Sequence, residues 1–299
     1  MRPIDIKQIR CFLEVCRELN FSHASSNLHI SQSALSKIIQ SIEKELGILL
    51  FNRSTRHLQI TKEGEAILPY AKKVLRQMED FLQVAFEQKH AHSGEIRFGL
   101  PPVIGSSFFP SIIATFRRKY PNIKLTIVEE GSRVVEQTIL DGQIDLGITI
   151  LPIDREIFDV TPIVERKLKL VLPIHHPLSN RKSLSLSELK AEEFLMFNQD
   201  FSLYDQVRNA CIKAGFEPII IQESSQWDFM MKMVASENGI CILPETICEH
   251  ADLTKCAVVQ ITDPELDWNL AILRRKDSYL SSVVSIWINF ITSSFQQHP

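Results

Sequence analysis

The chain has 299 residues, of which 44% are hydrophobic and 23% charged, a composition that is typical of a folded protein and excludes an intrinsically disordered one. A chain of this length usually forms more than one hydrophobic core, so we expect two or three domains. No apolar run approaches the roughly 18 residues that span a bilayer, and the first residues lack a signal peptide. We therefore expect a cytoplasmic protein that does not associate with membranes.

The net charge of −3 is distributed unevenly along the chain. Residues 1–62 contain nine Lys/Arg and five Asp/Glu, a balance of +4, which leaves −7 for the remainder. This asymmetry favours a basic nucleic-acid-binding module joined to an acidic body, but it is weak evidence alone. The cysteines form no CxxC pair, so we interpret them as reduced and buried, with a peroxide-sensing pair among the last four left open. They are Cys11, Cys16, Cys211, Cys241, Cys248 and Cys256.

The first fifty residues show the periodicity of three short helices. Apolar residues recur at helical spacing in 7–19, and a second short helix follows with Ser22 as its expected cap. Ser31 is the expected cap of a third helix, which Gly47 ends. Because only a short turn separates the second and third helices, the pattern predicts a helix-turn-helix.

Residues 49–61 predict two short strands around a polar tip at 53–57, which is a wing. From Thr61 to about residue 88 apolar residues repeat at three and four, which predicts one long helix. Its apolar seam favours pairing with a second copy of the chain, and packing against its own domain is the alternative. The seam comprises Ile67, Leu68, Ala71, Val74, Leu75, Met78, Leu82 and Ala85.

After a polar segment at 90–94, strands and helices alternate as in a parallel α/β fold. Residues 96–150 predict a βαβαβ unit, and residues 169–243 predict a second α/β lobe. A last strand at 269–274 and a helix at 279–295 are expected to complete the first lobe. The predicted boundaries are 1–61 for the DNA-binding domain, 62–92 for the linker and dimerisation helix, and 93–299 for the effector-binding domain. Within the last, lobe I comprises 93–161 and 268–299, and lobe II comprises 162–267.

The third helix has the two faces that a recognition helix needs. With Leu35, Ile38, Ile39 and Ile42 facing inward, short polar side chains lie outward near its N-terminus, where they can read base edges in the major groove. Arginines at the wing tip suit phosphate or minor-groove contacts. Any one of these residues alone is more often simply solvated, but the combination favours DNA binding. The candidate DNA-binding residues are Ser22, Gln32, Ser33, Ser36, Lys37, Gln40, Arg53 and Arg56.

This arrangement resembles the LysR-type transcriptional regulator family. The residues that carry the resemblance are Ser31–Ser36, Ile42–Gly47, Leu50–Arg53, Arg56 and Ile60–Gly64, then Pro110, Phe116, Tyr120-Pro121, Asp141–Ile148 and Glu237–Pro244. The resemblance implies an α/β protein with an N-terminal winged helix-turn-helix, a long linker helix and a two-lobed periplasmic-binding-protein-like effector domain. It also implies a homodimer, often a homotetramer, that binds double-stranded promoter DNA, and a small-molecule effector. Ser25 departs from the family's usual alanine.

In open α/β lobes, ligands bind at the carboxyl ends of strands, where helix N-termini offer unpaired N–H groups. This description fits residues 101–107, 131–133 and 199–203, and we expect all three segments to face the cleft between the two lobes. By resemblance, Val103, Ile104, Ser132, Phe201 and Ser202 lie at or beside effector positions. Pro102-Val103 departs from the serine or threonine that carboxylate-binding members place there. Because Arg133 is the only arginine and no lysine lies in these segments, we expect a small ligand with about one carboxylate. The alternative is that the serines are plain helix caps.

Catalysis finds little support, because the chain lacks GxSxG, HExxH and P-loop motifs, and we expect no enzyme activity, cofactor or metal. The adjacent His175 and His176 favour a surface turn over a metal site. The alternative interpretation of the whole chain is a small-molecule-binding or enzymatic α/β protein with a vestigial DNA module.

Overall fold

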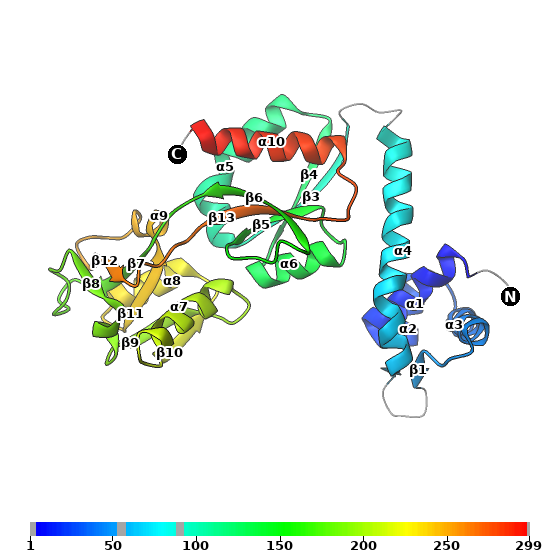
Figure 1. Cartoon of the computed structure of the whole chain (residues 1–299), viewed down its shortest axis with the longest axis horizontal. Helices are drawn as coiled ribbons and strands as arrows, with labels where there is room; N and C mark the ends of the chain where they lie inside the picture. Colours follow the sequence, from blue (N-terminus) through cyan, green and yellow to red (C-terminus); the bar gives the residue numbers. More distant parts are fainter. Residues whose placement is uncertain (1–3, 53–57, 88–92, 298–299) are drawn as a thin grey trace. The chain divides into compact units, whose positions relative to one another are not determined.

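The computed structural model describes residues 4–52, 58–87 and 93–297. The chain divides into two compact units, Met1–Lys89 and His90–Pro299 (Figure 1). Among the described residues, every helix is too short or too polar to cross a bilayer.

The first unit contains the three predicted helices, α1 (Ile6–Glu18), α2 (Phe21–Asn27) and α3 (Gln32–Leu46). Their apolar faces meet in one core that includes Phe12, Val15, Leu35 and Ile39. Ser31 caps α3 by accepting a hydrogen bond from the Ala34 N–H, and Gly47 ends the helix at φ +70°, as predicted. The prediction of Ser22 as the cap of α2 is wrong. Asn20 is the cap, and its side chain accepts hydrogen bonds from the N–H groups of Ser22 and His23.

The predicted wing strands form an antiparallel pair, β1 (Phe51–Asn52) and β2 (Gln59–Ile60). The buried Glu43 carboxylate accepts hydrogen bonds from the N–H groups of Leu50 and Phe51, and thereby ties the wing to α3. Gly64 packs so close to the wing that an added Cβ would lie 2.6 Å from the Leu50 carbonyl oxygen. The glycine is therefore required for the wing to lie against the next helix.

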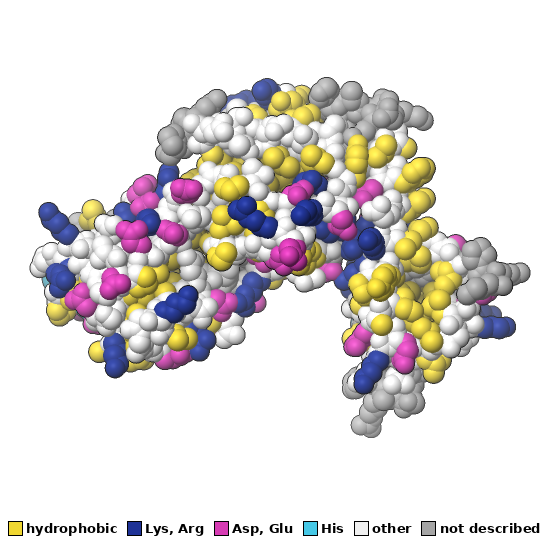
Figure 2. All heavy atoms as spheres, in the orientation of Figure 1, with side chains coloured by type: hydrophobic (Ala, Val, Ile, Leu, Met, Phe, Trp, Pro, Cys, Tyr) yellow, Lys and Arg dark blue, Asp and Glu magenta, His cyan; other side chains and the backbone are white. Residues whose placement is uncertain are grey.

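The long helix is α4 (Lys62–Glu87), and the Thr61 hydroxyl caps it by accepting a hydrogen bond from the Gly64 N–H at 3.0 Å. Its first turns pack on the helix-turn-helix core through Ile67, Leu68 and Ala71. Beyond them, hydrophobic side chains follow α4 on the surface (Figure 2). The large exposed hydrophobic residues of α4 are Tyr70, Val74, Phe81, Leu82 and Val84.

One lobe of the second unit is a five-stranded sheet of order β4-β3-β5-β13-β6. The first three strands are parallel, whereas β13 runs antiparallel to both of its neighbours. Helices α5, α6 and α10 accompany the sheet (Figure 1). The bounds are β3 (Gly94–Leu100), α5 (Pro102–Lys119), β4 (Ile123–Glu129), α6 (Ser132–Leu140), β5 (Leu146–Ile150), β6 (Phe158–Val164), β13 (Leu270–Arg275) and α10 (Ser282–Gln297).

The other lobe is a mixed six-stranded sheet of order β10-β9-β11-β7-β12-β8, accompanied by short helices. The bounds are β7 (Leu168–Pro173), β8 (Ser183–Ser185), η1 (Leu186–Leu189), β9 (Glu193–Phe197), α7 (Ser202–Lys213), β10 (Ile219–Ser224), α8 (Trp227–Ala235), β11 (Ile240–Pro244), α9 (Glu245–Cys248) and β12 (Cys256–Asp263).

Two segments cross between the sheets side by side, and two backbone hydrogen bonds join them, from the Leu168 N–H to the Leu266 carbonyl and from the Trp268 N–H to the Arg166 carbonyl. The predicted lobe division at residue 161 falls inside β6, whose pairing with β13 runs to Val164. Strand β6 itself was not predicted. It lies at an edge of its sheet, the position where a strand tolerates a proline such as Pro162.

Candidate functional site

The outer face of α3 presents the predicted DNA-binding side chains together. Gln32, Ser33, Lys37 and Gln40 are exposed and Ser36 is half-buried, while Leu35, Ile39 and Ile42 are buried on the opposite face. The outward residues recur at intervals of three and four, so they line one stripe of the helix. That stripe has amide, hydroxyl and ammonium groups, which are the groups that bind base edges and phosphates.

Ser22 joins this surface from α2. Its hydroxyl donates a hydrogen bond to the Gln32 Oε1 atom at 3.2 Å. The bond leaves both N–H donors of the Gln32 side-chain amide for another acceptor. The remaining two candidates, Arg53 and Arg56, lie outside the described residues.

The predicted effector-binding residues lie at the starts of three helices in the second unit. Pro102, Val103 and Ile104 form the first turn of α5, Ser132 begins α6, and Ser202 begins α7 directly after Phe201. In the first turn of a helix, N–H groups have no helical acceptor. Val103, Ile104, Ser132 and Phe201 are buried, and Pro102 and Ser202 are half-buried.

The two serines are not helix caps. Gly131 and Phe201 occupy the cap positions, and neither helix start has a side-chain capping bond. The hydroxyl oxygens of Ser132 and Ser202 are buried without a hydrogen-bond partner among the described residues, and so is the side-chain oxygen of Asn198. A buried polar atom without a partner costs about 1 to 3 kcal/mol, so these atoms indicate a place for a ligand.

The starts of α6 and α7 meet across the two lobes in what we call the lobe junction, formed by Gly131, Arg133, Gln199, Asp200 and Asp205. An added Cβ on Gly131 would lie 2.4 Å from the Asp200 carbonyl oxygen. Arg133 forms an ion pair with Asp205 and donates a hydrogen bond to the Gln199 carbonyl at 3.1 Å. The lobes are therefore in direct contact beside both serines.

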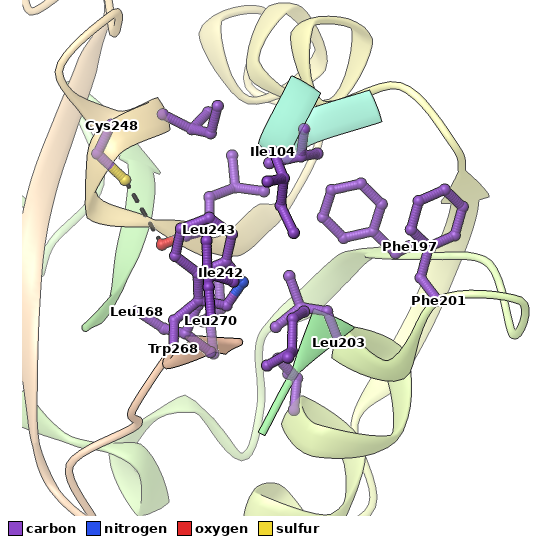
Figure 3. Packing of buried hydrophobic residues seen from close by; sticks show 14 of the residues in the cluster. Ile104, Leu168, Phe197, Phe201, Leu203, Ile242, Leu243, Cys248, Trp268 and Leu270 are labelled. Carbon is purple, nitrogen blue, oxygen red and sulfur yellow. Dashed lines mark hydrogen bonds between the residues drawn. The ribbon is translucent and has the colours of Figure 1, made fainter. Parts of the chain in front are cut away.

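Apolar side chains fill the space next to the junction. Figure 3 shows Ile104 of α5 beside Phe197 of the other lobe, with Phe201 on the far side of the Phe197 ring and Leu203 below. The rings of Phe197 and Phe201 stack with centroids 5.2 Å apart. Val103, Ile104 and Phe201 therefore belong to one hydrophobic cluster that extends over both lobes. A hollow of 480 Å³, lined by α5, the ends of β3 and β4 and residues 225–228, includes one of the predicted effector residues, Pro102.

Sequence reasoning missed Asn198, whose signal is its position directly after β9, at the carboxyl end of the strand. It also missed Asp205 as the partner of Arg133, because a contact between two lobes leaves no local pattern. The two histidines lie in a turn, as predicted. His176 nevertheless has an acidic partner, the Glu192 carboxylate at 3.1 Å.

No group of three potential metal ligands occurs within 4–52, 58–87 and 93–297. The thiols of the described cysteines are hard to ionise, because burial raises the pKa of Cys16, Cys211 and Cys248 to about 12. Burial also raises the pKa of Cys241 well above its ordinary value.

Comparisons with known proteins agree with this architecture. Residues 6–65 match the family described as bacterial regulatory helix-turn-helix protein, lysR family, and residues 89–296 match the LysR substrate binding domain. The HTH-type transcriptional regulator YwbI of Bacillus subtilis is 40% identical over 99% of this chain and 98% of its own length. The transcriptional dual regulator GltC of the same organism is 25% identical over 98% of each chain.

Among solved structures, a full-length variant of OxyR from Pseudomonas aeruginosa superposes with a TM-score of 0.72 at 25% identity, covering 99% of this chain and 96% of its own. The two family models between them cover the DNA-binding part and the two-lobed part, and each of these relatives covers both parts. The chain belongs to the LysR family of DNA-binding transcriptional regulators.

Proposed function

We propose that this regulator binds its promoter through the α3 stripe and that a small organic acid, bound where the two lobes meet, modulates that binding. The observation that carries the effector proposal is the pair of buried serine hydroxyls, Ser132 and Ser202, which begin two helices from opposite lobes and have no partner among the described residues. A carboxylate accepts hydrogen bonds from hydroxyl and helix N-terminal N–H groups, so it fits both positions.

The charge at the lobe junction limits the ligand to a small anion. Arg133 is already paired with Asp205, so its guanidinium does not offer a full positive charge to a ligand. Helix N-termini contribute only partial charges, which suit one carboxylate better than a polyphosphate. The apolar neighbours Ile104 and Phe201 favour a short carbon skeleton beside the acid group.

In DNA binding, we assign base readout to Gln32, Ser36 and Gln40, and phosphate contacts to Ser22, Ser33 and Lys37. A glutamine amide forms paired hydrogen bonds with adenine, and a serine hydroxyl can donate a hydrogen bond to a base edge or accept one from it. Arg53 and Arg56 remain sequence-based candidates for phosphate or minor-groove contact. The exposed apolar side chains of α4 support assembly into a homodimer, and a homotetramer is the further expectation from the family resemblance.

Calorimetry on the full-length protein tests the effector proposal. Short-chain carboxylic acids are titrated into the wild type and into Ser132→Ala and Ser202→Ala. We expect one acid to bind the wild type and to lose about tenfold in affinity in each variant, since a hydrogen bond to a charged group contributes about 1.5 to 3 kcal/mol. Undiminished affinity in both variants would place the effector elsewhere.

A further inference from the structure

A hollow of 350 Å³ lies at the end of the five-stranded sheet that is opposite to the candidate effector position. Strand β13 runs antiparallel to β5, so its last residue, Arg275, lies at the edge where the parallel strands begin. The starts of α5 and α6 follow the carboxyl ends of those strands, about 17 Å away along β13. The hollow therefore belongs to one lobe and takes no part in the contact between the lobes.

Two segments build this hollow, one directly before β6 and one at the end of β13, and we call it the β6–β13 hollow. The Lys276 N–H donates a hydrogen bond to the Ile157 carbonyl at 3.1 Å, which holds the two segments side by side. The Ser278 N–H and hydroxyl both donate to the Arg275 carbonyl and hold the second segment in a turn. Small-metabolite sites occupy about 300 to 1,000 Å³, so the hollow suits a small ligand. The lining residues are Glu156, Ile157, Arg275, Lys276 and Asp277.

The guanidinium of Arg275 gives the hollow a positive wall. The side chain is only 10% exposed, and its Nε atom donates to the Asp277 carboxylate. Its Nη1 atom is buried without a partner in the described part of the chain, so the positive charge is incompletely balanced. Nη1 itself is covered by the protein. A ligand therefore meets the accessible tenth of the side chain, where the delocalised charge of the guanidinium attracts an anionic group.

Two further charged side chains line the hollow from opposite segments. Lys276 and Glu156 are both exposed, and neither has an ion-pair partner within 4–52, 58–87 and 93–297. Together with the paired Arg275 and Asp277, they give the hollow two positive and two negative side chains. A site with balanced charges of both signs is complementary to a ligand that is neutral overall and has separated positive and negative groups.

We propose that the β6–β13 hollow is a second ligand site and that it binds a free α-amino acid. The carboxylate of the amino acid pairs with Lys276 and with the accessible part of Arg275, and its ammonium group pairs with Glu156. An aliphatic side chain of the ligand packs on Ile157, which is 44% exposed. Because the walls come from a single lobe, binding here does not require the two lobes to approach each other, unlike binding at the proposed effector position.

Calorimetry on the full-length protein tests the proposal with compounds that differ in one charged group. The probes are alanine, valine and leucine, each compared with the carboxylic acid that lacks its amino group and with the amine that lacks its carboxyl group. We expect at least one amino acid to bind, and both of its analogues to bind about tenfold more weakly, since each loses a charge-assisted hydrogen bond.

The two unpaired charges are exposed, so they can be removed without disturbing the core. Glu156→Gln and Lys276→Met should each weaken binding of that amino acid about tenfold. Glu249→Gln and Lys190→Met, at exposed positions of the other lobe, are the matched controls and should bind as the wild type does. Ile157→Trp should fill the hollow and block binding without changing the charge.

Ser132→Ala should keep the wild-type affinity for the amino acid, which separates this site from the effector position. The proposal is overturned if no probe amino acid binds at millimolar concentration, or if an analogue without one charged group binds as tightly as the amino acid. It is equally overturned if Glu156→Gln, Lys276→Met or Ile157→Trp binds as well as the wild type, or if Ser132→Ala loses binding.

Discussion

Replacing Gly131 with alanine should force the lobe junction apart. Gly131 has φ −59° and ψ 151°, a conformation that any residue adopts, so the substitution introduces no backbone strain. Its added Cβ would, however, lie 2.4 Å from the Asp200 carbonyl oxygen and 2.9 Å from the carbonyl carbon. Non-bonded carbon contacts settle near about 3.5 Å, so the lobes must separate by about 1 Å at this point.

The free-energy cost of Gly131→Ala is that of overpacking the contact between residue 131 and Asp200. Overpacking a tight contact costs about 1 to 3 kcal/mol, which corresponds to an equilibrium shift of about 5- to 150-fold away from the closed lobes. The Arg133 and Asp205 side chains are 49% and 40% exposed, and ion pairs at such positions contribute about 0 to 1 kcal/mol. Gly131→Ala should therefore open the junction more than Asp205→Ala does.

Hydrogen exchange followed by mass spectrometry on the full-length protein measures this opening. In Gly131→Ala, amides at 130–133 and 198–203 should exchange about 5 to 150 times faster than in the wild type. Amides of the central strands β3 and β9 should keep the wild-type exchange rate. Glu130→Ala, at the exposed neighbouring position, is the control and should behave as wild type. Unchanged protection at the junction, or a uniform loss of protection through both lobes, would refute the reasoning.

Three further results are expected. Leu82→Glu places a charge on the exposed apolar face of α4 and should give monomers in sedimentation. The control Gln77→Glu should stay dimeric at the same concentrations. An unchanged oligomer in Leu82→Glu would show that the interface does not involve this face of α4. Burial raises the pKa of Glu136 above its ordinary value, although the Thr149 hydroxyl and Arg133 oppose the shift, so the folded state favours the protonated acid. The wild type should lose stability as pH rises from 4.5 through the raised pKa. Glu136→Gln should remove this trend in urea titrations, and a Glu136→Gln curve parallel to wild type would contradict it. Finally, a thiol with a pKa of about 12 is ionised to only about one part in 10⁵ at neutral pH, and this applies to Cys211 and Cys248. In the native protein both cysteines should therefore react with peroxide far more slowly than a free thiol does. Mass spectrometry of the peroxide-treated protein measures this difference.

Local patterns in the sequence were sufficient for the first unit. Helical periodicity and turn residues predicted α1, α2, α3 and the wing, because each of these elements buries one face within a few dozen residues of its neighbours. The cap of α2 was misplaced by two residues, since Asn20 and Ser22 both have side chains that cap helices and only the backbone conformation decides between them.

The second unit was predicted less completely, because its sheets are assembled from distant segments. Strands β6, β8 and β12 were missed, and β13 pairs antiparallel in a sheet that was expected to be parallel. The segments of the candidate effector site were predicted from their positions after strands. Their position on one cleft was also predicted. The direct contacts between the lobes were not, because the approach of Gly131 to Asp200 and the pairing of Arg133 with Asp205 join residues about 70 positions apart.

The central claim, that the α3 stripe reads a specific DNA sequence, is tested most directly by fluorescence anisotropy with a DNA site selected from a random pool. At physiological salt, the wild type should prefer this site over shuffled DNA by at least about 10³-fold. Gln32→Ala should lose about 1 to 3 kcal/mol on the selected site, with its affinity for shuffled DNA unchanged. Gln143→Ala, an exposed glutamine of the second unit, is the matched control. Equal binding of selected and shuffled DNA by the wild type, or full selectivity in Gln32→Ala, would contradict the account.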